Sequence, residues 1–142
     1  MVLPVSRMTF RIGTNGRASN DGDMVTIRDM ESFSINFDNG VEQWSPLDEG
    51  GWTRRLTTAK SITISLSGKR NYLDRGNNYA ASLAYETGHE CNTVFDVAFP
   101  NGHTMRMNCV VNVTETDGGG ATDIASLDME ILSDGRPEYF LP

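Results

Sequence analysis

The chain has 142 residues with 38% hydrophobic and 22% charged side chains, a formal net charge of -7 and a sequence pI near 4.7. This length suits one folded domain over residues 1–142. The acidic balance argues against sequence-independent binding of nucleic acid, which needs clustered lysine and arginine. No apolar run approaches the roughly 18 residues of a membrane span, and the first nine residues do not resemble a signal peptide, so we expect cytoplasmic synthesis and no membrane contact.

Apolar residues recur at every second position from the start of the chain, which is typical of strands with one buried and one exposed face. The alternation predicts strands over 8–12 and 33–37, and a short strand over 25–27 follows the turn signal Asn20-Asp21-Gly22. The same pattern returns over 62–66, 95–99, 105–113 and 127–131. The sequence therefore predicts an all-β chain.

A long loop is predicted over residues 40–60, between strands that end near Asp38 and begin near Ser61. It holds both tryptophans of the chain and two adjacent arginines. Tryptophan and arginine are enriched at interface hot spots because they bury a large area and still form hydrogen bonds at their edges. We expect this loop to contact another subunit, unless its tryptophans fold back to plug the end of the barrel; both could hold for different residues. The candidate interface residues are Trp44, Leu47, Trp52, Arg54 and Arg55.

Two of the predicted strands are strongly polar on one face. Serine and threonine alternate with the apolar residues of the strand that follows the loop, and two carboxylates alternate with those of the last long strand. We interpret both as solvated strand faces and not as a pair of catalytic carboxylates. The polar positions are Ser61, Thr63, Ser65, Ser67, Asp128 and Glu130.

One short helix is predicted over about 78–87. Asn77 or Asn78 could cap its start, and Gly88 is placed to end it. A single short helix in a chain of strands is expected to cover one open face or end of the sheet.

A hairpin is predicted around Pro100-Asn101-Gly102, because a three-residue loop with Gly102 in the left-handed region pairs Phe99 with His103. The two cysteines, Cys91 and Cys109, are too few for a disulfide framework, and we expect both to be reduced.

The sequence shows no pattern typical of an enzyme. The zinc-type ligands His89, Cys91, His103 and Cys109 would be spread along about 10 strand residues, or roughly 30 Å, which is too far for one metal site. No nucleophile elbow, phosphate-binding loop, dinucleotide fingerprint or zinc-protease helix is present. We therefore expect no catalytic residue, no metal and no cofactor.

Several motifs nevertheless resemble the major tail tube proteins of long-tailed bacteriophages and related prophages, over roughly residues 8 to 140. They lie in the predicted loop, just after the next strand, at the predicted hairpin and near the end of the chain. The motifs are Trp44-x-Pro46-Leu47-Asp48, Gly51-Trp52, Arg54-Arg55-Leu56, Thr58-x-Lys60, Leu66-Ser67-Gly68-Lys69-Arg70-Asn71 with Asp74 and Gly76-Asn77, Phe99-Pro100-Asn101-Gly102, and Ser133-Asp134-Gly135-Arg136-Pro137.

The resemblance implies a fold and an assembly. The fold would be a β-sandwich or open barrel of about seven or eight strands flanked by a short helix, related to the tube protein of type VI secretion. Six subunits would form a ring whose inner wall is a continuous sheet, and stacked rings would form a hollow tube for the genome. The loop 40–60 would reach neighbouring subunits or the next ring. The polar positions of the two strands could then line the channel, where negative charge would keep DNA from adhering.

The resemblance also implies partners and a location. Besides copies of itself, the chain would meet a tape-measure protein inside the tube, tail initiator or baseplate and terminator proteins, and a sheath if the tail contracts. DNA would pass without specific binding. The protein would reside in the virion tail after assembly in the cytoplasm of a bacterial host.

Two other functions stay open at this stage. A single-ring tail terminator or baseplate-type component would form rings that never stack. A small β-barrel binding domain would use Trp44 and Trp52 to hold a sugar or a peptide.

Overall fold

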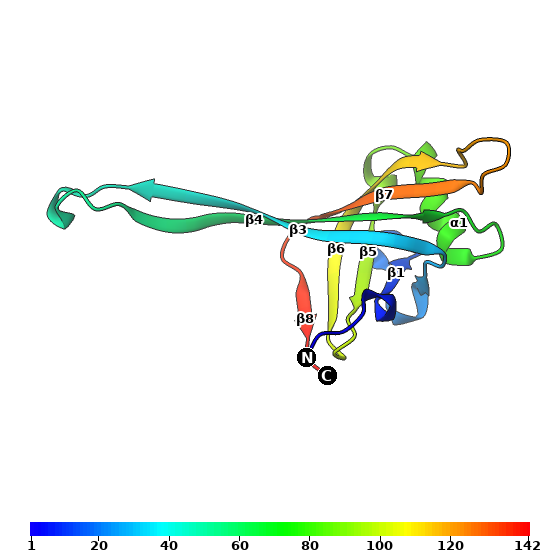
Figure 1. Cartoon of the computed structure of the whole chain (residues 1–142), viewed down its shortest axis with the longest axis horizontal. Coiled ribbons are helices and arrows are strands. Elements are labelled where there is room, and N and C mark those ends of the chain that lie inside the picture. Colours follow the sequence, from blue (N-terminus) through cyan, green and yellow to red (C-terminus); the bar gives the residue numbers. More distant parts are fainter.

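Eight strands form one antiparallel sheet in the computed structural model, which describes residues 1–142 (Figure 1). The strand order is β2-β1-β5-β6-β7-β4-β3, and β8 pairs with the start of β6, beyond the end of β7. This architecture confirms the predicted all-β class. The strands are β1 (Thr9–Gly13), β2 (Met24–Thr26), β3 (Met30–Trp44), β4 (Arg54–Lys69), β5 (Asn92–Ala98), β6 (Thr104–Thr116), β7 (Ser126–Ser133) and β8 (Glu138–Phe140).

The sheet curls into an open barrel around one core. The rings of Phe10 on β1 and Phe33 on β3 lie 5.0 Å apart, although their strands stand near opposite ends of the strand order. Eighteen buried apolar residues form a single cluster inside. Burial follows the period of two that the sequence shows, and along β4, β6 and β7 the buried apolar side chains are Ile62, Ile64, Leu66, Met105, Met107, Cys109, Val111, Leu127, Met129 and Ile131.

The hairpin between β5 and β6 has the predicted register. The amide of Phe99 donates to the carbonyl of His103 at 2.9 Å, and Gly102 adopts a φ of 89°. Val97 then pairs with Met105 and Phe95 with Met107, so apolar residues of both strands share the inner face.

The helix lies earlier than predicted. The helix α1 spans Arg75–Ser82 and a 3-10 turn continues over Leu83–Tyr85, so the predicted range of about 78–87 was wrong at both ends. The carboxylate of Asp74 caps the start by accepting from the amide of Asn77 at 2.9 Å, and Glu86 is already extended. Asp74 takes the cap because the Asn77 side chain is buried and forms other hydrogen bonds.

The predicted loop 40–60 was also wrong, because it is mostly strand. β3 and β4 stay paired past a bulge at Gly40/Val41 out to Trp44 and Arg54, and the hairpin projects far from the barrel (Figure 1). Only residues 45–53 connect the two strands. Alternation failed to indicate these strand segments because both of their faces are exposed, so neither face selects apolar side chains.

Two further features complete the fold. The short strand β8 has no buried residue, which is why no hydrophobic pattern indicates it. No helix in the chain combines the length and apolar character needed to cross a bilayer.

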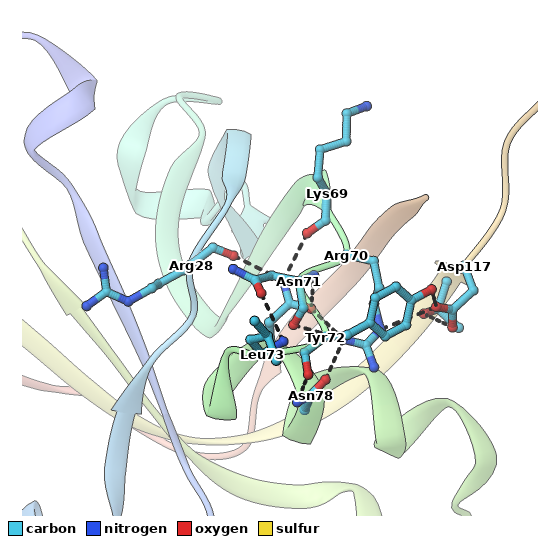
Figure 2. Close-up of polar contacts among 10 residues, drawn as sticks. Arg28, Lys69, Arg70, Asn71, Tyr72, Leu73, Asn78 and Asp117 are labelled. Carbon is cyan, nitrogen blue, oxygen red and sulfur yellow. Dashed lines mark hydrogen bonds and ion pairs between the residues drawn. The ribbon is translucent and has the colours of Figure 1, made fainter. Parts of the chain in front are cut away.

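A polar corner holds the end of β4 against α1 and the loop between β6 and β7 (Figure 2). The Arg70 guanidinium donates to the side-chain oxygens of Asn77 and Asn78, both at 2.8 Å, and lies 4.6 Å from the centre of the Tyr72 ring. The Tyr72 hydroxyl donates to Asp117 at 2.6 Å. Asn77, which is fully buried, also donates to two backbone carbonyls, so these contacts fix the geometry of the corner.

The hydrogen bond between Tyr72 and Asp117 changes the pKa values of the two groups in opposite directions. Accepting it lowers the pKa of the Asp117 carboxyl, because the bond favours the ionised carboxylate. The same bond raises the pKa of the Tyr72 phenol, because an ionised phenol can no longer donate.

Gly76→Ala should destabilise the protein by about 1–3 kcal/mol, because the added Cβ would lie 2.2 Å from the backbone oxygen of Thr26. Urea unfolding measures the loss. Ser82→Ala, at an exposed position of the same helix, is the control and should stay within about 0.5 kcal/mol of wild type. A Gly76→Ala protein as stable as Ser82→Ala would contradict the close packing of α1 on β2.

Tyr72→Phe should lower stability most between roughly pH 4 and pH 10. The lowered Asp117 pKa stabilises the fold above the unfolded-state pKa of aspartate, and this contribution is lost as pH falls through the folded-state value. The raised Tyr72 pKa stabilises the fold below the unfolded-state pKa of tyrosine, and this contribution is lost as pH rises through the folded-state value. Urea unfolding across pH tests both limits.

Tyr85→Phe is the control for the Tyr72 variant, because Tyr85 is exposed and its hydroxyl forms no hydrogen bond within the chain. A Tyr72→Phe penalty that stays constant from pH 2 to pH 11 would show that the hydrogen bond to Asp117 is not its source.

Candidate assembly surfaces

The hairpin arm, residues 40–60, is a two-stranded ribbon with no layer packed on either face. Its strands pair from Gly40 with Ala59 to Trp44 with Arg54. Every residue from Val41 to Ser45 and from Leu47 to Lys60 is exposed. An isolated two-stranded ribbon is marginally stable in water, so the arm depends on the anchored half of β3 and β4 and is suited to pack against something outside its own barrel.

The arm presents its large apolar side chains near the tip. Trp52 is 79% exposed and Leu47 is fully exposed, while Trp44 is 44% exposed. Neither tryptophan folds back toward the barrel, so the alternative in which they plug its end was wrong. Large exposed apolar side chains gathered on one projection are typical of a protein contact site.

The five predicted interface residues all lie on the arm, and a cation–π contact joins two of them. The Arg54 guanidinium lies 5.7 Å from the centre of the Trp44 ring, a cation–π contact between paired residues. Arg55 is paired with Gln43 and therefore points to the opposite face. Neither arginine pairs with a carboxylate in the chain, which leaves both guanidinium groups free for a partner.

The tip is closed by its own hydrogen bonds. The hydroxyls of Ser45 and Thr53 lie 3.2 Å apart, and the amide of Trp52 donates to the carbonyl of Glu49 at 3.2 Å. Gly50 and Gly51 have φ values of 62° and 89°, a left-handed conformation that other residues rarely adopt. The tip is therefore an ordered turn that fixes where Leu47 and Trp52 stand.

The polar positions of β4 and β7 form one surface, which we call the polar wall. Ser65 is paired with Glu130 and Ser67 with Asp128, and the Ser67 hydroxyl donates to the Asp128 carboxylate at 2.5 Å. A shallow groove of about 390 Å³ runs over this surface. The pairing of β4 with β7 brings together the predicted positions Thr63, Ser65, Ser67, Asp128 and Glu130. Ser61 lies on β4 before this pairing begins and is paired with Asp38 on β3.

The polar wall is wider than predicted. β3 adds polar residues opposite those of β4, and Asn112 on β6 lies opposite Glu130. None of these positions carries lysine or arginine. The signal for the β3 residues was present in the sequence as polar alternation between Phe33, Ile35 and Phe37. The added positions on β3 are Ser32, Ser34, Asn36 and Asp38.

Cations on the other half of the same sheet are neutralised. Arg11 on β1 and Arg106 on β6 both donate to the carboxylate of Asp96 on β5, which is only 1% exposed. Arg106 also pairs with Asp21 at 2.6 Å, which lowers the pKa of that carboxyl. The sheet therefore carries carboxylates without an ion-pair partner on β3 and β7, and charge-paired groups on β1, β5 and β6.

The outer edge of β3 is unpaired over its whole length, because β3 ends the strand order and bonds only to β4. An exposed strand edge of 15 residues offers a row of backbone donors and acceptors to another chain. This edge is the second surface on which copies of the chain could join.

The histidines and cysteines that were weighed as zinc ligands form no common site. His103 forms a hydrogen bond with Tyr139 at 2.7 Å, and His89 lies 3.2 Å from the Asn92 amide. Cys109 is a free thiol whose pKa is raised to about 12 by burial, so it stays protonated at neutral pH. No three His, Cys, Asp or Glu side chains gather closely enough to hold a metal ion.

No protein-family model matches the sequence. No curated protein matches it either.

Solved structures do match, over nearly the whole chain. The chain is similar to a protein in the tail of an empty gene transfer agent particle refined with C6 symmetry, with a TM-score of 0.77 and 19% identity over 99% of this chain and 100% of that one. It is similar to a chain of the PVC sheath–tube complex of an extracellular contractile injection system, with a TM-score of 0.65 and 14% identity over 99% and 92%.

A third similar structure is a tube-terminating cap of the anti-feeding prophage, with a TM-score of 0.64 and 15% identity over 100% of this chain and 93% of that one. At such identities the likeness establishes the fold. The tail tube fold expected from the sequence motifs is therefore confirmed for this chain.

Proposed function

We propose that this chain is a structural subunit of a phage-type tail tube, in which hexameric rings stack into a hollow conduit. The observation that carries the proposal is the hairpin arm, which exposes Trp44, Leu47 and Trp52 on a ribbon that contributes nothing to its own core. Contact with a second copy would bury these exposed apolar side chains. The tail tube fold supports the same function.

The unpaired edge of β3 supports ring formation. A closed ring in which strand edges of neighbouring copies meet would satisfy the backbone groups that a monomer leaves open. Six copies are proposed in accordance with the C6 symmetry of the similar gene transfer agent tail.

The polar wall supports a channel lining. Its serine and threonine hydroxyls bind water, and its carboxylates Asp38, Asp128 and Glu130 repel phosphate. DNA would pass such a wall without adhering. The proposed partners are further copies, a tape-measure protein inside the tube, initiator or baseplate and terminator proteins, and a sheath if the tail contracts, all in a virion tail assembled in the cytoplasm of the host.

A second candidate is a component that ends or caps a tube as a single ring. Its support is the likeness to the tube-terminating cap and to a sheath/tube terminator of an injection system, the latter with a TM-score of 0.66. This component would form rings that do not stack. A binding domain for sugar or peptide is less well supported, because Trp44 and Trp52 stand on a ribbon with no second layer to enclose a ligand.

Trp52→Ala should weaken assembly by about 2 kcal/mol or more per contact, or about 30-fold in the association constant, because Trp52 is a large exposed anchor of the arm. Sedimentation velocity and negative-stain microscopy of concentrated protein measure this. Wild type should form rings and tubes, and Trp52→Ala should form far fewer at the same concentration.

Tyr85→Ala, which removes another exposed aromatic side chain far from the arm, is the control and should assemble as wild type does. Both variants should melt like wild type, since neither side chain enters the core. A wild-type protein that stays monomeric at every concentration, even with tail initiator present, would refute the tube; rings without tubes would favour the terminator.

A further inference from the structure

A groove of about 700 Å³ lies where the hairpin arm leaves the barrel. It runs between the arm and the segment that joins β7 to β8, which passes the root of the arm in Figure 1. Phe37, which is 58% exposed, lines it together with Ala59, Ile62 and Pro137. We call this surface the root groove; four hydroxyl side chains also line it, and they are Thr57, Thr58, Ser61 and Ser133.

The root groove carries unpaired positive charge. Lys60 and Arg136 both line it, and neither forms an ion pair with a carboxylate of the chain. In a chain of net charge -7, two free cations beside an apolar surface favour a partner that is both acidic and apolar.

The arm tip has the complementary composition. Asp48 and Glu49 lie between Leu47 and Trp52, all four are exposed, and neither carboxylate forms an ion pair. The tip is therefore acidic and apolar in the way the root groove is basic and apolar.

A tip does not reach the groove of its own chain. Seven residue steps of extended strand separate Phe37 from Trp44, which is about 23 Å at the usual rise of a strand. The paired ribbon extends straight outward from the barrel in Figure 1. The tip and the groove of one copy thus both remain open.

We propose that the arm tip of one copy docks into the root groove of a second copy, with Leu47 and Trp52 on the apolar lining and Asp48 and Glu49 beside Lys60 and Arg136. This inference rests on the proposed tube function and names the surface that receives the arm. Each copy contributes a different surface to the contact, so the contact is head-to-tail and leaves a free tip at one end and a free groove at the other. Repetition then adds copies in one direction.

Charge reversal on each side separately tests the contact. The tip variant is Asp48→Lys with Glu49→Lys, and the groove variant is Lys60→Glu with Arg136→Glu. Each alone should reduce the amount of tube about tenfold or more at the wild-type assembly concentration, because like charges then face each other. Tube mass is measured by sedimentation and tube length by negative-stain microscopy.

An equimolar mixture of the two variants is the decisive experiment. The lysine tip of one variant matches the glutamate groove of the other, and the native tip of the second matches the native groove of the first, so the mixture should regain tubes to within about twofold of wild type. The matched control is Glu86→Lys with Glu90→Lys, which makes the same change in net charge as the tip variant at two exposed positions outside arm and groove and should assemble normally.

Single variants that form wild-type tubes, or a mixture that fails to recover them, would overturn the docking of tip into groove while leaving the tube function standing. A wild-type protein that forms neither rings nor tubes would overturn the tube function itself, and the docking with it. Recovery in the mixture also shows that both variants are folded.

Discussion

The pairing of β3 with β4 is the interaction on which the hairpin arm and the polar wall both depend. It runs from Met30 opposite Gly68 to Trp44 opposite Arg54 through one hairpin. In its inner half, Ile62, Ile64 and Leu66 of β4 enter the core. The other face of β4 carries part of the polar wall. In its outer half no core is present, and the ribbon becomes the arm. The buried half therefore holds the exposed half in a fixed direction.

That division has an energetic basis. A ribbon of two strands is marginal in water, and here the buried apolar residues of β4 and β7 anchor it. The polar corner adds a second anchor at the far end of β4, where Arg70 joins α1 to the loop that follows β6. Because both anchors lie outside the arm, changes at the arm tip should affect association far more than folding. This separation makes the proposed contacts testable with exposed residues alone.

The sequence predicts the barrel well and the arm poorly, for one physical reason. Alternation appears where one face is buried and one is wet, so β1, β4, β6 and β7 are readable, as is the register at Gly102. The arm has two wet faces and β8 has no buried residue, so neither shows alternation. The helix range shifted because two asparagines competed as caps in the sequence, whereas Asp74 caps the helix and Asn77 is buried.

The candidate surfaces show the same contrast. Trp44, Leu47, Trp52, Arg54 and Arg55 could be selected from composition alone, because large apolar and cationic side chains seldom gather in a connection by chance. The root groove could not, since Phe37, Lys60 and Arg136 are distant in sequence and only the path from β7 to β8 brings Arg136 beside the arm. The polar wall could be predicted in part. Alternation in the sequence indicated its positions on β4 and β7, whereas the strand pairing was required to place the β3 residues beside them.

Stacked rings of this chain are proposed to enclose a channel lined by the polar wall. A helical reconstruction of the assembled protein by cryo-electron microscopy tests it most directly. In the reconstruction, Ser65, Ser67, Asp128 and Glu130 should face the lumen, and each arm should leave its own ring to contact another subunit. A tube whose lumen is lined by the other face of the sheet, or an arm that is free in solvent within the tube, would contradict it.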